Sequence, residues 1–191
     1  PIKDVIYLSV NYYDEIWVID HSTTTAEAQS ESGGNYNKGG DLVYRFGNPN
    51  TYNSLGDKIF DKNHFPNLLE DGIPGEGNVL VYVNGNSTEQ SIIYELEMPS
   101  NFNLEPNSNN EPNIVWSYLN DEIFSGKLCG AIRLPNGNTV ITESDYGLWE
   151  VTENGEIAWK YLKDETANFI WRSYHYTRDG ALSQSLGLNQ D

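Results

Sequence analysis

Three runs near the end of the chain decide the fold: Asn138-Thr-Val-Ile-Thr-Glu143, Tyr146-Gly-Leu-Trp-Glu-Val151 and Glu156-Ile-Ala-Trp-Lys-Tyr161. All three are rich in the β-branched and aromatic residues that favour β-strands. Asn154-Gly155 stands between the last two, and these residue types adopt the positive φ angles of tight hairpin turns. A fourth run, Gly130-Ala-Ile-Arg-Leu134, leads into the turn Pro135-Asn-Gly-Asn138. The sequence therefore predicts four antiparallel strands between Gly130 and Tyr161.

The same pattern of strands occurs twice more upstream, within residues 4–46 and 59–118. The last strand of each unit ends in an aromatic-x-aromatic pair: Tyr44/Phe46, Trp116/Tyr118 and Trp159/Tyr161. Four-stranded sheets repeated along a chain are typical of β-propeller blades. A β-sandwich also uses short strands and frequent turns, but it gives no reason for the recurring pair. We therefore predict an all-β fold of the β-propeller type.

We expect residues 1–191 to form a single partial propeller domain. Its blades are predicted at about 4–46, 59–118 and 129–161, followed by a closing strand at 169–176. The first blade has no room for an inner strand before Asp4. Because closed propellers have about four to eight blades, three blades leave open edges that attract further strands. We expect either self-association or a missing N-terminal half to complete the ring.

The composition excludes several classes of function. The 191 residues include 11 Lys and Arg against 28 Asp and Glu, a formal net charge of −17, which argues against nucleic-acid binding. No apolar run approaches the roughly 20 residues of a membrane-spanning helix, so no membrane span is expected. The single cysteine, Cys129, excludes an intrachain disulfide and a CxxC metal site, and no metal is predicted.

Blocks of the sequence resemble the arylsulfotransferase family, the bacterial aryl-sulfate sulfotransferases built as six-bladed propellers. The similar blocks are Glu15–Ala28, Gly39–Pro49, Asp71–Asn78, Arg133–Thr139 and Leu148–Thr152, and Trp171-Arg-Ser-Tyr-His-Tyr176 is similar to the strand that ends the family domain. Together they cover nearly the whole chain but only the C-terminal half of a family member. The resemblance therefore implies about three four-stranded blades, half of a six-bladed propeller.

The resemblance also implies an activity. The family transfers a sulfuryl group from an aryl sulfate to a phenolic acceptor through a sulfated histidine, without a dissociable organic cofactor. Aryl sulfates and phenols are accordingly the expected small-molecule partners. We expect a periplasmic or extracellular location, although the single cysteine leaves the compartment open.

His64 corresponds to the family's catalytic nucleophile. It stands seven residues before Asp71, which opens the Asp-Gly-x-Pro-Gly block of the family. A neutral imidazole, with a reference pKa of about 6.5, keeps a nucleophilic lone pair at neutral pH. The alternative interpretation is a partly buried histidine that bonds a backbone group.

Three further residues are candidates for substrate binding. Asn11 stands where the family has an arginine; it can donate a hydrogen bond but carries no charge. Arg133 ends a predicted inner strand, where it either faces the central channel and an anionic substrate or is an ordinary surface cation paired with one of the 28 acidic residues. His175 alternates with Tyr174 and Tyr176, and it is expected either to line the channel or to seal a blade edge.

The missing arginine leaves a second function open. A propeller that has lost its active site retains a scaffold for binding or assembly, because most of the similar blocks also serve the packing of blades. The sequence therefore predicts either an arylsulfotransferase-like enzyme or a non-catalytic propeller module.

Overall fold

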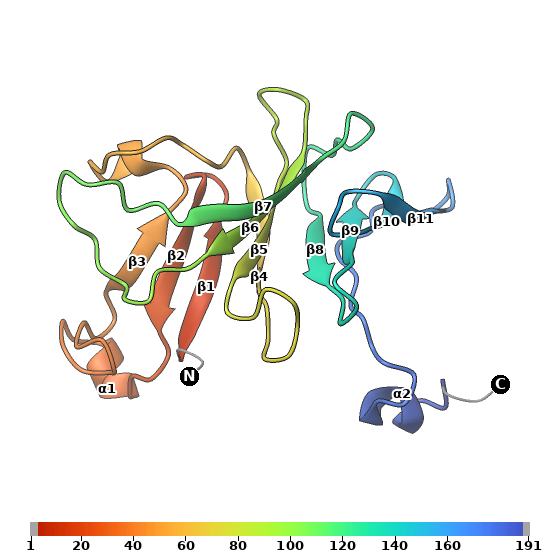
Figure 1. Ribbon diagram of the computed structural model, residues 1–191. Coiled ribbons are helices and arrows are strands. Elements are labelled where there is room, and N and C mark those ends of the chain that lie inside the picture. Colours follow the sequence, from red (N-terminus) through yellow and green to blue (C-terminus); the bar gives the residue numbers. More distant parts are fainter. Residues whose placement is uncertain (1–3, 189–191) are drawn as a thin grey trace.

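The chain folds into three antiparallel sheets that follow one another along the sequence (Figure 1). The computed structural model describes residues 4–188, and it confirms the all-β prediction. The strands of the first sheet are β1 (Val5–Val10), β2 (Glu15–Asp20) and β3 (Leu42–Phe46). Those of the second sheet are β4 (Asn63–Leu68), β5 (Val79–Val83), β6 (Ile92–Glu97) and β7 (Asn113–Leu119). Those of the third sheet are β8 (Gly130–Arg133), β9 (Thr139–Glu143), β10 (Gly147–Val151) and β11 (Ile157–Leu162).

The strand order is the same in every sheet. Strands pair with their neighbours in sequence, so the second sheet runs β4-β5-β6-β7 and the third β8-β9-β10-β11. Trp116 of β7 lies opposite Glu95, and Trp159 of β11 lies opposite Glu150, so the two tryptophans occupy equivalent positions. The predicted repeat of antiparallel units is thereby confirmed. The helical segments α1 (Thr25–Ala28), η1 (Pro49–Thr51) and α2 (Ala181–Ser185) are short.

Two apolar clusters lie between successive sheets, and β5 contributes to both of them. Val79, Val81 and Val83 pack toward the first sheet, whereas Leu80 and Tyr82 pack toward the third. Because alternate residues of a strand point to opposite faces, a strand between two sheets must be apolar at every position. All five residues of β5 are buried, and burying one such side chain contributes about 1.5–3 kcal/mol.

The structure corrects one predicted element. Residues 169–176 form no strand; they run as an extended segment along the third sheet toward α2 (Figure 1). The physical reason is the lack of a partner strand among residues 4–188. The Ile170 amide donates to the Ser144 carbonyl at 3.2 Å. One such bond does not make the ladder of hydrogen bonds that defines a strand pair. The prediction of a closing strand is therefore wrong for the isolated chain.

The first sheet ends at β1, as the sequence predicts. Within the described residues no strand pairs with the free edge of β1, whereas its counterparts β5 and β9 pair with β4 and β8. No helix within residues 4–188 is long and apolar enough to span a bilayer.

Candidate functional site

His64 lies on β4, the first strand and one edge of the second sheet, immediately before a β-bulge. His64 is opposite Tyr82, but the next registered pair is Asn67 with Leu80, so Phe65 and Pro66 share one partner position. Phe65 adopts a φ of 52°, a conformation that bulky residues rarely adopt. Bulges of this kind redirect neighbouring side chains, and they occur often beside functional sites.

The tautomer of His64 follows from its hydrogen bond to Asn84, a fully buried residue just after β5. The Asn84 Nδ2 donates to the carbonyl of Ser125 at 2.6 Å and to that of Leu128 at 3.5 Å. Carbonyl oxygens only accept, so the Oδ1 of Asn84 must face His64, where it lies 2.6 Å from Nδ1. Nδ1 of His64 therefore carries the proton, and Nε2 carries the lone pair.

Asn11 lies at the reactive nitrogen of His64. Its Nδ2 is 3.2 Å from the Nε2 of His64, and the tautomer makes the amide the donor. The structure thus brings together two of the four predicted site residues, which are separated by 53 positions in sequence. Both residues are half-buried.

The surroundings of His64 keep its imidazole neutral. Burial lowers the pKa of His64, and the positive charge of Arg172 acts in the same direction. Hydrogen bonds to Asn84 and to the backbone of Lys62 oppose these effects only in part. A neutral imidazole with its lone pair on Nε2 is the form that attacks an electrophile.

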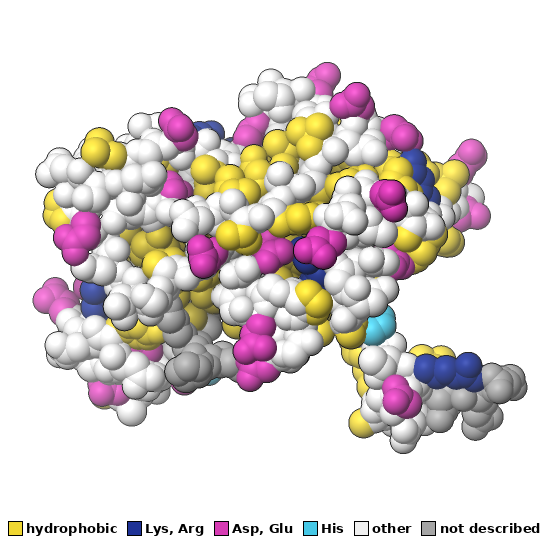
Figure 2. Space-filling view, in the orientation of Figure 1, with side chains coloured by type: hydrophobic (Ala, Val, Ile, Leu, Met, Phe, Trp, Pro, Cys, Tyr) yellow, Lys and Arg dark blue, Asp and Glu magenta, His cyan; other side chains and the backbone are white. Residues whose placement is uncertain are grey.

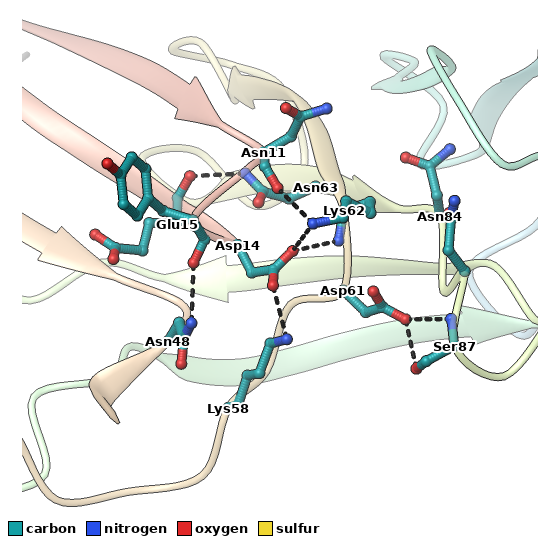
Figure 3. A network of polar contacts seen from close by, with 12 residues as sticks. Asn11, Asp14, Glu15, Asn48, Lys58, Asp61, Lys62, Asn63, Asn84 and Ser87 are labelled. Atoms are coloured by element: carbon teal, nitrogen blue, oxygen red, sulfur yellow. Dashed lines mark hydrogen bonds and ion pairs between the residues drawn. The ribbon is translucent and has the colours of Figure 1, made fainter. Parts of the chain in front are cut away.

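A group of lysine and aspartate side chains borders the same end of β4 (Figure 3). The Lys62 Nζ donates to the Asn11 carbonyl and to Asp14 Oδ1, each at 3.3 Å. Lys58 forms a 2.7 Å ion pair with the other oxygen of Asp14. Although burial acts to raise the pKa of Asp14, the hydrogen bonds from Lys58 and Lys62 hold it below its ordinary value. Asp14 is therefore ionised; it binds both lysines and holds Lys62 beside Asn11.

Sequence reasoning missed Arg172 and Asn84. Arg172 comes from the extended C-terminal segment, where its guanidinium lies 4.8 Å from the ring centre of Phe65. It supplies a positive charge near His64 that Asn11 cannot supply. The sequence feature that could have pointed to Arg172 is its place as the single arginine among the aromatic residues of 169–176. For Asn84, the signal was an amide directly following the wholly apolar strand β5.

Arg133 does not join this site. Its Nη2 forms a 2.6 Å ion pair with Glu95 Oε2, and its guanidinium lies 5.0 Å from the ring centre of Trp116. Both charged side chains are buried between the second and third sheets. Arg133 therefore meets an acidic residue, as one of the two sequence interpretations expects, but in the interior of the protein.

His175 lies with Arg133 rather than with His64. Both line a cavity of about 430 Å³ between the Asn67–Glu70 end of β4, the end of β8 and the C-terminal segment. His64 is at the opposite end of β4. The four predicted residues thus form two separate pairs, and only Asn11 accompanies the proposed nucleophile.

Among residues 4–188 no three His, Cys, Asp or Glu side chains are grouped as ligands for a metal ion. Fold and site together define an all-β protein with an oriented, neutral histidine on the edge strand β4. Comparison with known proteins adds no identity: no family model, no curated protein and no solved structure matches the chain.

Proposed function

We propose that the chain is an arylsulfotransferase-like protein, in which His64 carries a sulfuryl group from an aryl sulfate to a phenol. One observation carries the proposal: Asn84 fixes the Nδ1 proton of His64, so the lone pair of Nε2 points to the side where Asn11 lies. A histidine that only capped a backbone group would not need a buried amide to select its tautomer.

The transfer proceeds in two displacements at sulfur. Nε2 of His64 attacks the sulfur of the aryl sulfate, the bond from sulfur to the aryl oxygen breaks, and the phenolate leaves. The sulfated ring keeps its Nδ1 proton, and Asn84 accepts a hydrogen bond from it. The oxygen of the acceptor phenol then attacks the same sulfur, the N–S bond breaks, and the phenol proton passes to solvent.

Positive groups around His64 suit the charge that develops in this reaction. Donors held in place around a transition state contribute a large part of catalysis. Arg172 acts on the His64 ring and Lys62 is held beside Asn11, and this positive charge supports a site that would stabilise sulfuryl oxygens and a departing phenolate. Asn11 must release Nε2, after which its amide can donate to a sulfuryl oxygen.

We propose further that the three sheets are blades of a β-propeller. Their common strand order, the apolar clusters between successive sheets, and the contact between the inner strands β4 and β8 support this arrangement. The inner strands of a propeller surround its central channel, so His64 would stand at the channel's mouth.

A different observation favours the second function, a non-catalytic binding module. Apolar side chains are exposed on the outer strand β7, where Ile114, Val115 and Leu119 are 44–54% exposed. Figure 2 shows the band of apolar surface that β7 contributes to this face. Exposed apolar surface of this kind is common at sites of protein association.

A labelling experiment separates the two functions. The chain is mixed with 4-nitrophenyl sulfate without acceptor, and the modified peptide is identified by mass spectrometry. Turnover is expected to be low, because Asn11 replaces an arginine, so the readout is a single transfer to the protein. We expect sulfation at His64, its loss in His64→Ala, and release of the label on adding a phenol.

His21→Ala is the matched control, because His21 is exposed and bonded to Asp4 on the first sheet. Labelling should be unchanged in this variant. Absence of any label on His64, or equal labelling in His64→Ala, would contradict the proposed enzyme and leave the binding module.

A further inference from the structure

The free edge of β1 lacks the strand that the other two sheets have. β5 pairs with β4 and β9 pairs with β8, but no strand among residues 4–188 pairs with that side of β1. On the face of β1 that points away from the second sheet, Ile6 and Leu8 are 45% and 43% exposed. An open strand edge beside exposed apolar side chains is a template for another strand.

The chain also holds a spare segment that fits this edge. Each sheet ends in an outer strand, and the next segment in sequence is the inner strand of the following sheet: β3 precedes β4, and β7 precedes β8. Residues 169–176 follow β11 in the same way. They carry no regular secondary structure, and they pair with no strand among residues 4–188. Their place in the sequence, directly after the outer strand of the third sheet, is the place of the inner strand of a fourth sheet.

We infer that two copies of this chain exchange residues 169–176, each segment adding to the free edge of β1 in the other copy. Every first sheet then has four strands, like the second and third. Two copies of three sheets make six, which lies within the range of closed propellers. Because the same exchange occurs twice about a two-fold axis, the contact closes and forms a dimer, not a filament.

Charge favours this partner. Residues 169–176 contain Arg172 and no acidic residue, so the exchanged segment carries +1 and the rest of the chain carries −17 less +1, or −18. A basic segment is therefore donated to a strongly acidic acceptor, which is the complementarity that fixes partners and register.

The surface available is also sufficient. Four aromatic side chains of the segment are about half exposed: Phe169 (44%), Trp171 (64%), Tyr174 (59%) and Tyr176 (59%). At about 150–250 Å² each, two exchanged segments and the surfaces that receive them bury about 1,200–2,000 Å². Stable specific interfaces bury about the same area.

The exchange retains the cation of the candidate site. A strand added to β1 lies beside β4, as β4 lies beside β8, because the inner strands of neighbouring sheets contact one another. Arg172 then reaches the neighbourhood of His64 from the second copy. The inference rests on the proposed propeller arrangement but not on the His64 chemistry.

The first test is the mass of the polypeptide in solution by light scattering and sedimentation. We expect the full chain to have twice its 21.6 kDa mass. Leu8→Lys in the full chain is expected to give monomers. The matched control is Ile114→Lys on β7, where the exposed fraction is 44%, and it should remain a dimer.

The second test is complementation. A chain ending at residue 168, whose fold is checked by circular dichroism, is expected to be a monomer that binds a fluorescent peptide of residues 167–178. A peptide with serine at Trp171, Tyr174 and Tyr176 should not bind. A monomeric full chain, a dimer that survives the truncation, higher oligomers, or loss of the dimer in Ile114→Lys would each overturn the inference. A monomer that is still labelled at His64 would overturn the exchange while supporting the proposed function.

Discussion

His64 and Arg133 occupy the first strands of neighbouring sheets, and the sequence assigns them to one site, yet their surroundings differ in kind. His64 contacts two amides, which satisfy its ring and leave the imidazole neutral and half-buried. Arg133 contacts a carboxylate and an indole, which surround its charge in the interior. Position on the first strand of a sheet therefore does not by itself decide the environment of a side chain. The side chains that other segments of the chain place beside it decide whether a neutral ring is oriented or a charge is paired.

The largest effect that tests this comparison is the loss of the Arg133–Glu95 pair. Arg133→Met leaves the Glu95 carboxylate buried without its cation, which is expected to lower the free energy of unfolding by about 3–5 kcal/mol. Asn78 Nδ2 still donates to Glu95 at 2.6 Å, so we expect the lower part of this range. Urea unfolding measures the change.

The double variant Arg133→Met/Glu95→Leu is the control, because it removes both charges together. Its stability should return close to that of the original chain. Labelling of His64 by an aryl sulfate should be unchanged in the folded variants. A cost below about 1 kcal/mol for Arg133→Met, or loss of labelling at His64, would contradict the structural role of Arg133.

Glu143 provides the next test, because it is buried in the third sheet with hydrogen-bond donors but no bonded cation. Burial raises the pKa of Glu143 to about 7, and bonds from Trp149 Nε1 and the Phe124 amide only partly offset this. The folded state therefore holds the proton more tightly than the unfolded chain. Stability from this group is complete below pH 4.5 and is lost as the pH rises through about 7.

The expected loss is about 3 kcal/mol between pH 4.5 and pH 8. Urea unfolding at several pH values measures it as the difference between the original chain and Glu143→Gln, which cannot titrate. If both chains show the same pH dependence, Glu143 is already ionised at pH 5 and the interpretation fails.

Gly130→Ala tests the contact between β8, which carries Arg133, and β4, which carries His64. Its effect on the free energy of unfolding should be smaller. A Cβ at Gly130 would lie 2.5 Å from Cδ1 of Phe65, the bulge residue next to His64. Overpacking of this kind costs about 1–3 kcal/mol. Gly126→Ala is the control, since its Cβ meets nothing closer than 3.5 Å. The free energy of unfolding and the NMR chemical shifts of the His64 ring are measured for both variants. A displaced bulge should change both quantities in Gly130→Ala and neither in Gly126→Ala.

The smallest expected effect is on the titration of His64. Its pKa should lie below 6.5, because burial and Arg172 both disfavour the imidazolium. Folding stability from this group is therefore present above pH 6.5 and falls as the pH drops toward the lower pKa of the folded state. Arg172→Ala removes a positive charge and should raise the pKa of His64 modestly. Nitrogen NMR should show the proton on Nδ1; a proton on Nε2 of the neutral ring would refute the role of Asn84.

Much of the fold could be predicted because the signals are local. The turn Asn154-Gly155 and the runs around Trp116 and Trp159 place strands within a few residues of their observed bounds. The wholly apolar run Val79–Val83 is a strand packed on both faces. The segment 169–176 shows the limit of such reasoning: it has strand-like residues, but a strand exists only where another strand pairs with it.

The candidate site was predictable only in part. His64 and Asn11 could be named from the resemblance, but no pattern in the sequence connects His64 with Asn84 or with Arg172. Arg133 was assigned to the site but lies outside it, and the sequence could not show this because its partner, Glu95, belongs to another sheet. Nothing near Arg133 in the sequence distinguishes a channel-lining cation from a buried one.

The sequence by itself determined the all-β class, the three repeated units and the aromatic pairs that end them, because strand propensity and turn chemistry act over a few residues. Tertiary structure alone decided which polar groups meet. His64 and Asn84 are 20 positions apart, Arg133 and Glu95 are 38, and Asn11 and His64 are 53. Such pairs form only when strand register and sheet packing bring distant segments within hydrogen-bond distance, and both depend on the folded chain as a whole.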